Sequence, residues 1–324
     1  MKSLKYSDVA LVPKYSEALT RASCDTSIKI GGRNFQLPII PANMKSVIDT
    51  DIASWMSEKD YFYIMHRFDI DILKFISQAN SENWKNISIS LGVKKHDEKI
   101  IEYIREKKLR VDFITIDIAH GYSLSMKKMI EYIKAELNDT MIIAGNVATP
   151  DAVVSLSNWG ADIVKVGIGQ GSPCTTKDKT GFTMPMFTCA RQCGDCYASR
   201  DRFDVGAKIP IIADGGVTCN GDIAKALVSG ADLVMAGGMF AACTDSPSLS
   251  TNIDNLACKG YFGSASVENK GHNKNIEGKL ITIPSNQMTY EEKLEEVKQD
   301  LQSAISYGGG LDLNCLKEVK HTEL

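Results

Sequence analysis

The chain has 324 residues, of which 44% are hydrophobic, so it can bury a full core as one large domain or as two ordinary ones. Lys and Arg total 37 against 40 Asp and Glu, and the resulting net charge of -3 lacks the basic excess that duplex nucleic acid or an anionic membrane favours. We therefore expect neither nucleic acid nor a membrane as a partner.

The N-terminal segment and the cysteines favour a cytoplasmic protein. No apolar stretch approaches the roughly 18 residues of a membrane span, and charged residues interrupt positions 1–19, where a secretory signal would be apolar. The nine cysteines are an odd number in a long chain, which favours reduced thiols over a disulfide framework.

Short apolar runs recur along the chain, and the segments between them have helical spacing, for example Ser123 to Leu137 and Thr149 to Trp159. Continuous hydrophobicity within a run predicts a strand covered on both faces, as in a parallel sheet wrapped by helices. We therefore expect a single α/β domain over residues 1–324 with a (β/α)8 TIM-barrel fold, and a doubly wound open sheet is the alternative. The eight expected strands lie at 37–43, 61–66, 87–93, 113–120, 141–148, 162–169, 209–217 and 232–240.

Catalytic groups of this fold lie where strands end and loops begin. The chain beyond residue 240 is longer than one closing helix requires, and it contains a glycine-rich segment at 260–279 followed by a helical tail from Tyr290 to Ile305. We expect the glycine-rich segment to be a mobile flap over the active site. Polar residues at the expected strand ends include Asn43, His66, Asp117, His120, Asn146 and Asp214.

The loop after the sixth strand combines three glycines with Cys174, two hydroxyl residues and two lysines. A thiol in such a polar, partly cationic loop is expected to have more thiolate character than one in a helix core, which suits a nucleophile. A buried loop cysteine, or a glycine-rich turn that cradles phosphate, is the alternative.

Each of the loops after the seventh and eighth strands carries a pair of glycines, in ADGGV (213–217) and AGGMF (236–240). Loops at these positions of the fold commonly bind a phosphate through backbone N–H groups. The pattern predicts a phosphorylated small molecule, a nucleotide first of all, and tight turns without a ligand are the alternative.

Cys189, Cys193 and Cys196 have the C-x3-C-x2-C spacing of a radical-SAM iron-sulfur site. The same spacing puts them on one face of a helix within 184–200, where they would serve as packing thiols. We take helix packing as the default, with a cluster or zinc as the alternative.

A series of motifs runs from the start of the chain to its C-terminal part, in the order YSDVALVP, LPIIPANM, ITIDIAHGYS, AGNVATP, VKVGIGQGSPCTT, PIIADGG, NGDIAKAL, GADLVMAGGMF, YFGSAS and EGK. In residues and in order they resemble the motifs of the inosine monophosphate (IMP) dehydrogenase and guanosine monophosphate (GMP) reductase family. Within that family the chain is similar to the shorter bacterial-type reductases. It lacks regulatory domains after the second strand, and it has neither Arg nor Tyr between Gly263 and Glu277, where the dehydrogenase flap carries an Arg-Tyr pair. An IMP dehydrogenase without regulatory domains and a non-catalytic purine nucleotide binder are the alternatives.

The resemblance implies reductive deamination of GMP to IMP in purine salvage, with NADPH as cofactor and release of ammonia. It implies a covalent thioimidate on Cys174 and proton transfer by Thr176 and Glu277. It further implies that Asp214 holds the ribose. The phosphate and base would contact Gly215, Gly216, Gly237, Gly238, Gly263, Ser264 and Ala265.

The resemblance also assigns residues to the cofactor. Asp117, Ile118 and Ala119 would line the nicotinamide end and Arg67 the phosphates, while Arg21 and Arg67 are the basic candidates for the 2'-phosphate. The carbonyls of Gly169, Gly171 and Cys174 match a monovalent-cation site, for which potassium is the expected ion. Relatives of this type imply a homotetramer.

Overall fold

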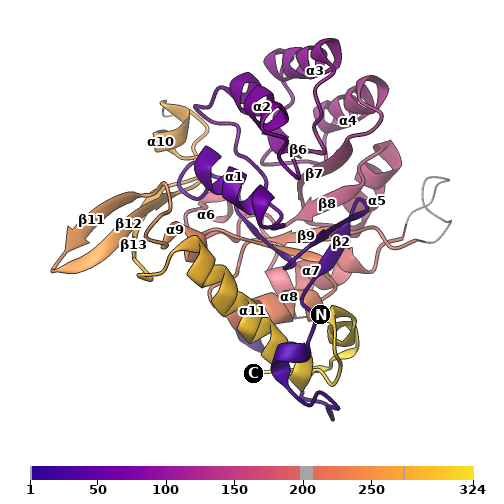
Figure 1. Cartoon of the computed structure of the whole chain (residues 1–324), viewed down its shortest axis with the longest axis vertical. Helices are drawn as coiled ribbons and strands as arrows, with labels where there is room; N and C mark the ends of the chain where they lie inside the picture. The colour runs from indigo at the N-terminus through magenta and orange to yellow at the C-terminus, as the bar shows by residue number, and fades with distance from the viewer. Residues whose placement is uncertain (1, 198–206, 273) are drawn as a thin grey trace.

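The computed structural model describes residues 2–197, 207–272 and 274–324. Its centre is a parallel sheet of seven strands in which nearly every residue is buried, as the continuous apolar runs predict (Figure 1). In chain order these strands are β4 (Ile39–Pro41), β5 (Ser88–Leu91), β6 (Phe113–Asp117), β7 (Met141–Val147), β8 (Ile163–Val166), β9 (Ile211–Asp214) and β10 (Leu233–Ala236).

The order of the strands follows that of a TIM barrel. From β5 to β10 each strand pairs with the next one in the chain, and β10 then pairs with β4, the first of the seven. A doubly wound sheet reverses its strand order at a switch point, so that alternative is wrong. The second expected strand, 61–66, is reduced to one parallel bridge between Met65 and Ile89, because only the Met65 N–H to Ser88 carbonyl bond (3.1 Å) joins this segment to β5.

Helices connect the strands and cover the outside of the sheet (Figure 1). The two helices expected near Ser123 and Thr149 are confirmed, because each of these residues is the N-cap of a helix. Pro150 follows Thr149 at the first helical position, where its missing N–H costs nothing. The helices are α1 (Thr50–Glu58), α2 (Ile72–Ser81), α3 (Lys95–Lys107), α4 (Leu124–Glu136), α5 (Pro150–Trp159), α6 (Thr176–Thr180), α7 (Met186–Gly194), α8 (Asn220–Val228) and α9 (Gly238–Ala241).

Short elements tie the two ends of the chain together. The antiparallel pairing of β1 (Val9–Leu11) with β14 (His321–Glu323) holds the N-terminal and C-terminal segments side by side. A second antiparallel pair is formed by β2 (Ile28–Ile30) and β3 (Arg33–Phe35). Three 3-10 helices complete these segments, η1 (Tyr6–Asp8), η2 (Arg21–Ser23) and η3 (Leu313–Glu318).

The segment expected to be a flap lies between two strands of a separate three-stranded antiparallel sheet. This sheet comprises β11 (Leu249–Ile253), β12 (Leu256–Phe262) and β13 (Leu280–Pro284), and α10 (Val267–Lys270) lies between the last two. Figure 1 shows that the sheet projects from the barrel. The helical tail is confirmed as α11 (Tyr290–Tyr307), which begins with a Thr289 capping box.

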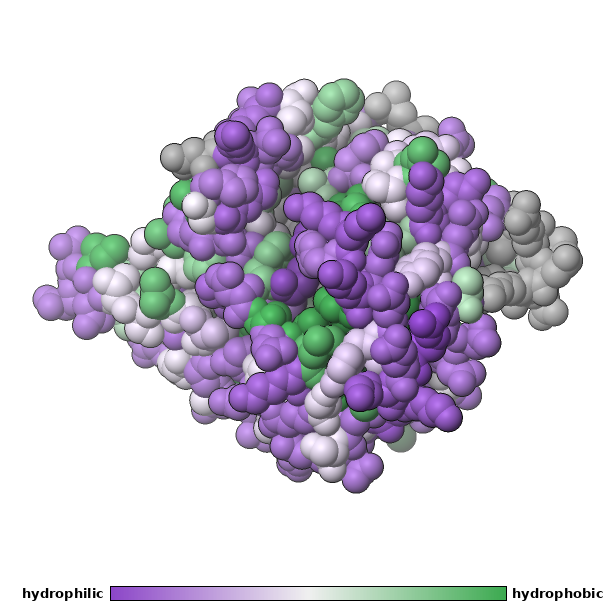
Figure 2. Space-filling model, turned by 90° about the horizontal axis from the view of Figure 1, so that it is seen from above, coloured by the Kyte–Doolittle hydropathy of each residue, from purple (hydrophilic) through white to green (hydrophobic). Residues whose placement is uncertain are grey.

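The projecting sheet exposes apolar side chains, among them Leu249 and Leu256. In Figure 2 hydrophobic residues appear both in the middle of the face shown and on the part of the molecule that projects to the left. Among the described residues, no helix is long and apolar enough to cross a membrane.

The second helix after β8, α7, carries two of the three clustered cysteines. Cys189 and Cys193 lie one turn apart on α7, fully buried, and the pKa of Cys193 is raised by its hydrogen bond with Cys189 and by burial. Cys196 follows the end of the helix, and its Sγ lies 3.8 Å from the carbonyl oxygens of Pro150 and Gln192. Within the described ranges no group of three His, Cys, Asp or Glu side chains is arranged to hold a metal ion. The last part of the expected helix, 198–200, lies outside the described residues.

Candidate active site

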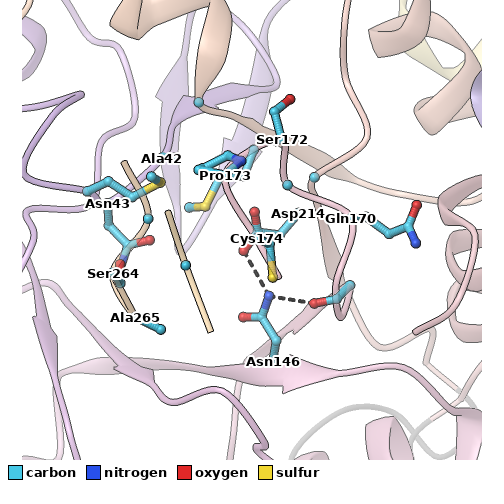
Figure 3. A pocket seen from close by; sticks show the side chains of 18 of the residues that line it. Ala42, Asn43, Asn146, Gln170, Ser172, Pro173, Cys174, Asp214, Ser264 and Ala265 are labelled. Atoms are coloured by element: carbon cyan, nitrogen blue, oxygen red, sulfur yellow. Dashed lines mark hydrogen bonds between the residues drawn. The ribbon is translucent and has the colours of Figure 1, made fainter. Parts of the chain in front are cut away.

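A cavity of about 410 Å³ opens where the parallel strands end. Every residue expected to contact substrate, cofactor or cation lines it, with the exception of Arg21. Figure 3 shows Cys174 near its centre, Asn146 and Asp214 close by, and Ser264 and Ala265 on the side away from Gln170. The expected residues that line the cavity are Arg67, Asp117, Ile118, Ala119, Gly169, Gly171, Cys174, Thr176, Asp214, Gly215, Gly216, Gly237, Gly238, Gly263, Ser264, Ala265 and Glu277.

Three side chains form a continuous hydrogen-bonded line at the edge of this cavity. The Cys174 thiol donates to the Thr176 hydroxyl across 3.2 Å, and that hydroxyl donates to Oε2 of Glu277 across 2.7 Å. All donors point toward Glu277, so a proton leaving the thiol can pass through Thr176 to the carboxylate. The arrangement provides both a base for the thiol and, once protonated, an acid.

Backbone pairing holds the flap against the Cys174 loop. Cys174 and Gly278 form an antiparallel bridge, in which the Thr175 N–H donates to the Glu277 carbonyl (2.8 Å) and the Lys279 N–H to the Pro173 carbonyl (2.9 Å). A bridge of this kind fixes the register of the two segments, and it therefore sets which flap side chain faces Thr176.

Lys165 is the main site residue that the sequence reasoning missed. Its side chain is 3% exposed, and Nζ lies 2.9 Å from Asp117 Oδ1 and 2.7 Å from Asp214 Oδ2. Burial acts to lower the pKa of Lys165, but the two carboxylates outweigh burial and raise it. Burial likewise acts to raise the pKa of Asp117, and the charges of Lys165 and Arg67 reverse the effect and lower it. The sequence offered one signal for this residue, because a lysine inside the apolar run IVKV is a charged residue in a strand expected to be buried.

Asn146 orients the same carboxylate from the end of β7. Its Nδ2 donates to Asp214 Oδ2 across 2.9 Å and to the Gly167 carbonyl across 2.7 Å, as the dashed lines of Figure 3 show. The Oδ1 atom of Asn146 is buried without a hydrogen-bond partner among the described residues. Because a buried polar atom without a partner is costly, Asn146 is suited to accept a hydrogen bond from a ligand.

The paired glycines occupy positions that side chains would block. Gly215 and Gly216 have φ values of +104° and +76°, which L-residues rarely adopt. A Cβ on Gly237 would lie 2.0 Å from the Tyr261 hydroxyl. The two loops therefore present bare backbone to the cavity, which suits an anionic group such as phosphate.

Tyr261, in β12, is a second lining residue that the sequence reasoning did not single out. Burial raises the pKa of its hydroxyl, and the charges of Asp214 and Cys174 add to the effect. A neutral hydroxyl beside Gly237 can donate to a bound anion. Its position two residues before the flap glycine, Gly263, was the local signal.

The expected cofactor residues separate into two places. Arg67 lies on the cavity, where its Nη2 donates to the Asp117 carbonyl (3.2 Å) and its guanidinium lies over the Phe68 ring (4.6 Å). Arg21 instead lies on α11, over the ring of Tyr307 and within 3.4 Å of Ser303 Oγ. The structure therefore does not bring Arg21 to this cavity, because η2 packs against the C-terminal helix.

The two histidines expected on the same rim do not line the cavity. His66 is buried, its Nδ1 accepts the Phe68 N–H across 3.2 Å, and burial, with Lys45 nearby, lowers its pKa to about 4. It is therefore a neutral packing residue at physiological pH. His120 is exposed in the loop between β6 and α4.

Comparison with known proteins agrees with this geometry. Residues 3–322 match the family model described as the IMP dehydrogenase / GMP reductase domain. The chain is 43% identical over 330 positions to the GMP reductase of Acidovorax ebreus (strain TPSY), covering 100% of this chain and 97% of the relative. It is 45% identical over 329 positions to that of Mesoplasma florum (100% and 98% covered), and 44% identical over 322 positions to that of Staphylococcus aureus strain MRSA252 (99% and 96% covered).

Proposed function

The chain belongs to the IMP dehydrogenase/GMP reductase family, and on this premise we propose that it reduces GMP to IMP and releases ammonia. It is an oxidoreductase of purine metabolism. The observation that carries the proposal is the line from Cys174 through Thr176 to Glu277, because it joins a nucleophile to a proton donor beside a nucleotide-sized cavity. The overall reaction consumes GMP, NADPH and two protons and yields IMP, NADP+ and ammonium.

In this proposal the sulfur of Cys174 bonds to C2 of the purine while its proton passes through Thr176 to Glu277. The departing amino group leaves as ammonia only if it is protonated, and Glu277 returns the proton for that step. The product of this half-reaction is a thioimidate on Cys174. Breaking the carbon-sulfur bond after reduction at C2 releases IMP, and the Cys174 thiolate left behind takes up a proton to restore the thiol.

The remaining lining residues hold GMP in position. Asp214 accepts hydrogen bonds from the ribose hydroxyls, and its place between Lys165 and Asn146 fixes the carboxylate for this task. The phosphate lies on the backbone of the paired glycines, and the flap closes over the purine. The phosphate and flap contacts are Gly215, Gly216, Gly237, Gly238, Gly263, Ser264 and Ala265.

The cavity rim fits a nicotinamide cofactor. The Nε atom of Arg67 is buried with no partner among the described residues, so it can donate to a bound phosphate or carboxamide. We assign Asp117, Ile118 and Ala119 to the nicotinamide end and Arg67 to the phosphates. NADPH, when bound, supplies the hydride.

We extend the proposal to three further properties. The carbonyls of Gly169, Gly171 and Cys174 would hold a potassium ion, since such ions prefer rings of backbone carbonyls. Positive φ at Gly169 (+74°) lets its loop turn there, and the Gly171 carbonyl, which accepts the Cys174 N–H (3.0 Å), keeps one lone pair. We also propose a homotetramer and a cytoplasmic location.

Absorbance at 340 nm tests the function directly. We expect GMP to cause loss of NADPH and to yield IMP and ammonia in equal amounts. Conversion of IMP with NAD to xanthosine monophosphate would overturn the assignment in favour of a dehydrogenase. Binding of GMP without loss of NADPH would indicate a nucleotide-binding protein instead.

A further inference from the structure

The short helix α6 presents two donors to the flap. It begins at Thr176, and Lys179 follows three positions later, so the two side chains lie on the same side of one helical turn. The Thr176 hydroxyl donates to the Glu277 carboxylate (2.7 Å), and the Lys179 ammonium donates to the carbonyl of Ile276 (2.6 Å). One turn of the barrel loop therefore holds two consecutive residues of the flap.

The Lys179 contact differs from the other lysine contact of the flap. Lys270 donates to the Asn275 carbonyl, so that bond closes a turn within the flap and moves with it. Lys179 belongs to the barrel side, and its bond to Ile276 spans 97 positions of the chain. A bond from the barrel to the flap, such as that of Lys179, restrains the position of the flap relative to Cys174, whereas a bond within the flap does not.

The Ile276 carbonyl that Lys179 holds belongs to the peptide unit that joins Ile276 to Glu277. This peptide is held at two points, at its N–H by the Ala265 carbonyl (3.1 Å) and at its C=O by Lys179. Without Lys179 the peptide could pivot about the remaining N–H bond and turn the Glu277 side chain away from Thr176. The backbone bonds fix the register, whereas the ammonium fixes the tilt of the peptide that precedes the acid. Proton transfer depends on such tilt because donor and acceptor must stay within hydrogen-bond reach.

We propose that Lys179 is a positioning residue that holds Glu277 on Thr176 by binding the Ile276 carbonyl, so that the amino group is protonated only while the flap is docked. The inference rests on the proposed reduction of GMP. Lys179 is exposed and does not line the cavity, so it is placed to touch neither the purine nor the thiol. Its effect on the reaction passes entirely through Glu277.

The test compares Lys179→Met with Lys179→Arg, which keeps the donor, and with Lys177→Met. Lys177 is exposed on the same helix, and its side chain has no hydrogen-bond partner among the described residues. Turnover of GMP by the wild-type protein is measured first, and its absence would overturn the proposed function and this inference together. We then expect Lys179→Met to lower kcat about tenfold while KM for GMP changes less than about twofold, as for a lost hydrogen bond that acts on the chemical step.

Two further measurements separate positioning from a structural role. Lys179→Arg should recover most of the rate, and Lys177→Met should match the wild type in both rate and melting temperature. In a Glu277→Gln background Lys179→Met should have little additional effect, because the proton donor that it positions is already gone. A Lys179→Met rate equal to that of Lys177→Met, or a full tenfold loss in the Glu277→Gln background, would overturn the inference.

Discussion

Thr176 donates its hydroxyl hydrogen to Glu277 across 2.7 Å, although 101 positions separate the two residues in the chain. Thr176 opens α6 beside the nucleophile, and Glu277 lies on the flap. The contact therefore exists only when the flap is docked on the Cys174 loop. Replacement of Cys174, at one end of the line from Cys174 through Thr176 to Glu277, should therefore affect a different step of the reaction from replacement of Glu277, at the other end.

Replacing Cys174 with Ser should abolish the covalent step and leave binding nearly intact. We expect GMP affinity to stay within severalfold, because the phosphate and ribose contacts remain, while turnover falls by at least ~10^3 for lack of thiolate character. Isothermal titration with GMP and the 340 nm assay measure the two quantities. Comparable turnover by the Ser variant would remove Cys174 from the mechanism.

Glu277→Gln should separate the two half-reactions. The amide keeps the size of the side chain but cannot deliver a proton to the amino group, so formation of the thioimidate from GMP should slow by ~10^2 to 10^4. The same intermediate formed from IMP and NADP+ requires no amine protonation. It loses only the base that Glu277 provides for the thiol, so it should be affected far less. Stopped-flow traces in both directions, with the exposed flap residue variant Glu268→Gln as control, measure the difference. Equal losses in both directions would mean that Glu277 serves flap closure or deprotonation of the thiol, and not protonation of the amino group.

Lys165→Met should destabilise the fold, because the Asp117 and Asp214 carboxylates, only 15% and 22% exposed, lose their shared buried cation. Breaking such a buried pair costs ~3 to 5 kcal/mol, whereas an exposed pair contributes ~1 kcal/mol or less. Urea unfolding should show this contrast with Lys45→Met, which removes an exposed pair with Asp69. Adding Asp117→Asn to Lys165→Met should recover part of the loss, and equal destabilisation by the Lys45 and Lys165 variants would contradict the electrostatic explanation.

His66 should make stability depend on pH in the acid range. Its pKa falls from an ordinary 6.5 to about 4 on folding, through burial and the nearby Lys45 charge, so between these values the unfolded state binds more protons than the folded one. The contribution is fully present above pH 6.5 and is lost as pH falls toward 4, by about 3 kcal/mol in total. Unfolding of His66→Asn, which keeps an acceptor for the Phe68 N–H, should lack this slope. The exposed-residue variant His96→Asn should retain it, and an unchanged slope in His66→Asn would refute the assignment.

Simultaneous replacement of Cys189, Cys193 and Cys196 with Ala should alter stability more than chemistry. All three thiols are buried, so the expected cost is ~1 to 3 kcal/mol from cavities and lost packing. Cys219→Ser, at an exposed thiol, serves as the control in thermal unfolding. Complete inactivation of a folded triple variant would favour a metal site instead.

Much of the barrel could be predicted because strand and helix signals are local. The run at 162–169 contains β8, and the helical spacing that starts at Ser123 and at Thr149 corresponds to α4 and α5. The run at 61–66 is equally apolar but forms a single bridge. Hydrophobicity predicts burial, whereas ladder formation depends on the hydrogen bonds that the neighbouring strand offers.

The sequence by itself determined that Cys174 follows a glycine-rich loop and that paired glycines end two later strands, since both are fixed by residue type and local spacing. Only the tertiary structure decided that Lys165 neutralises two carboxylates from other strands, that Arg21 lies on α11, and that the flap brings Glu277 to Thr176. The physical reason is that each of these contacts joins segments far apart in the chain. Their distances depend on how the barrel curls and how the flap pairs with its loop, and no local pattern of residues encodes either.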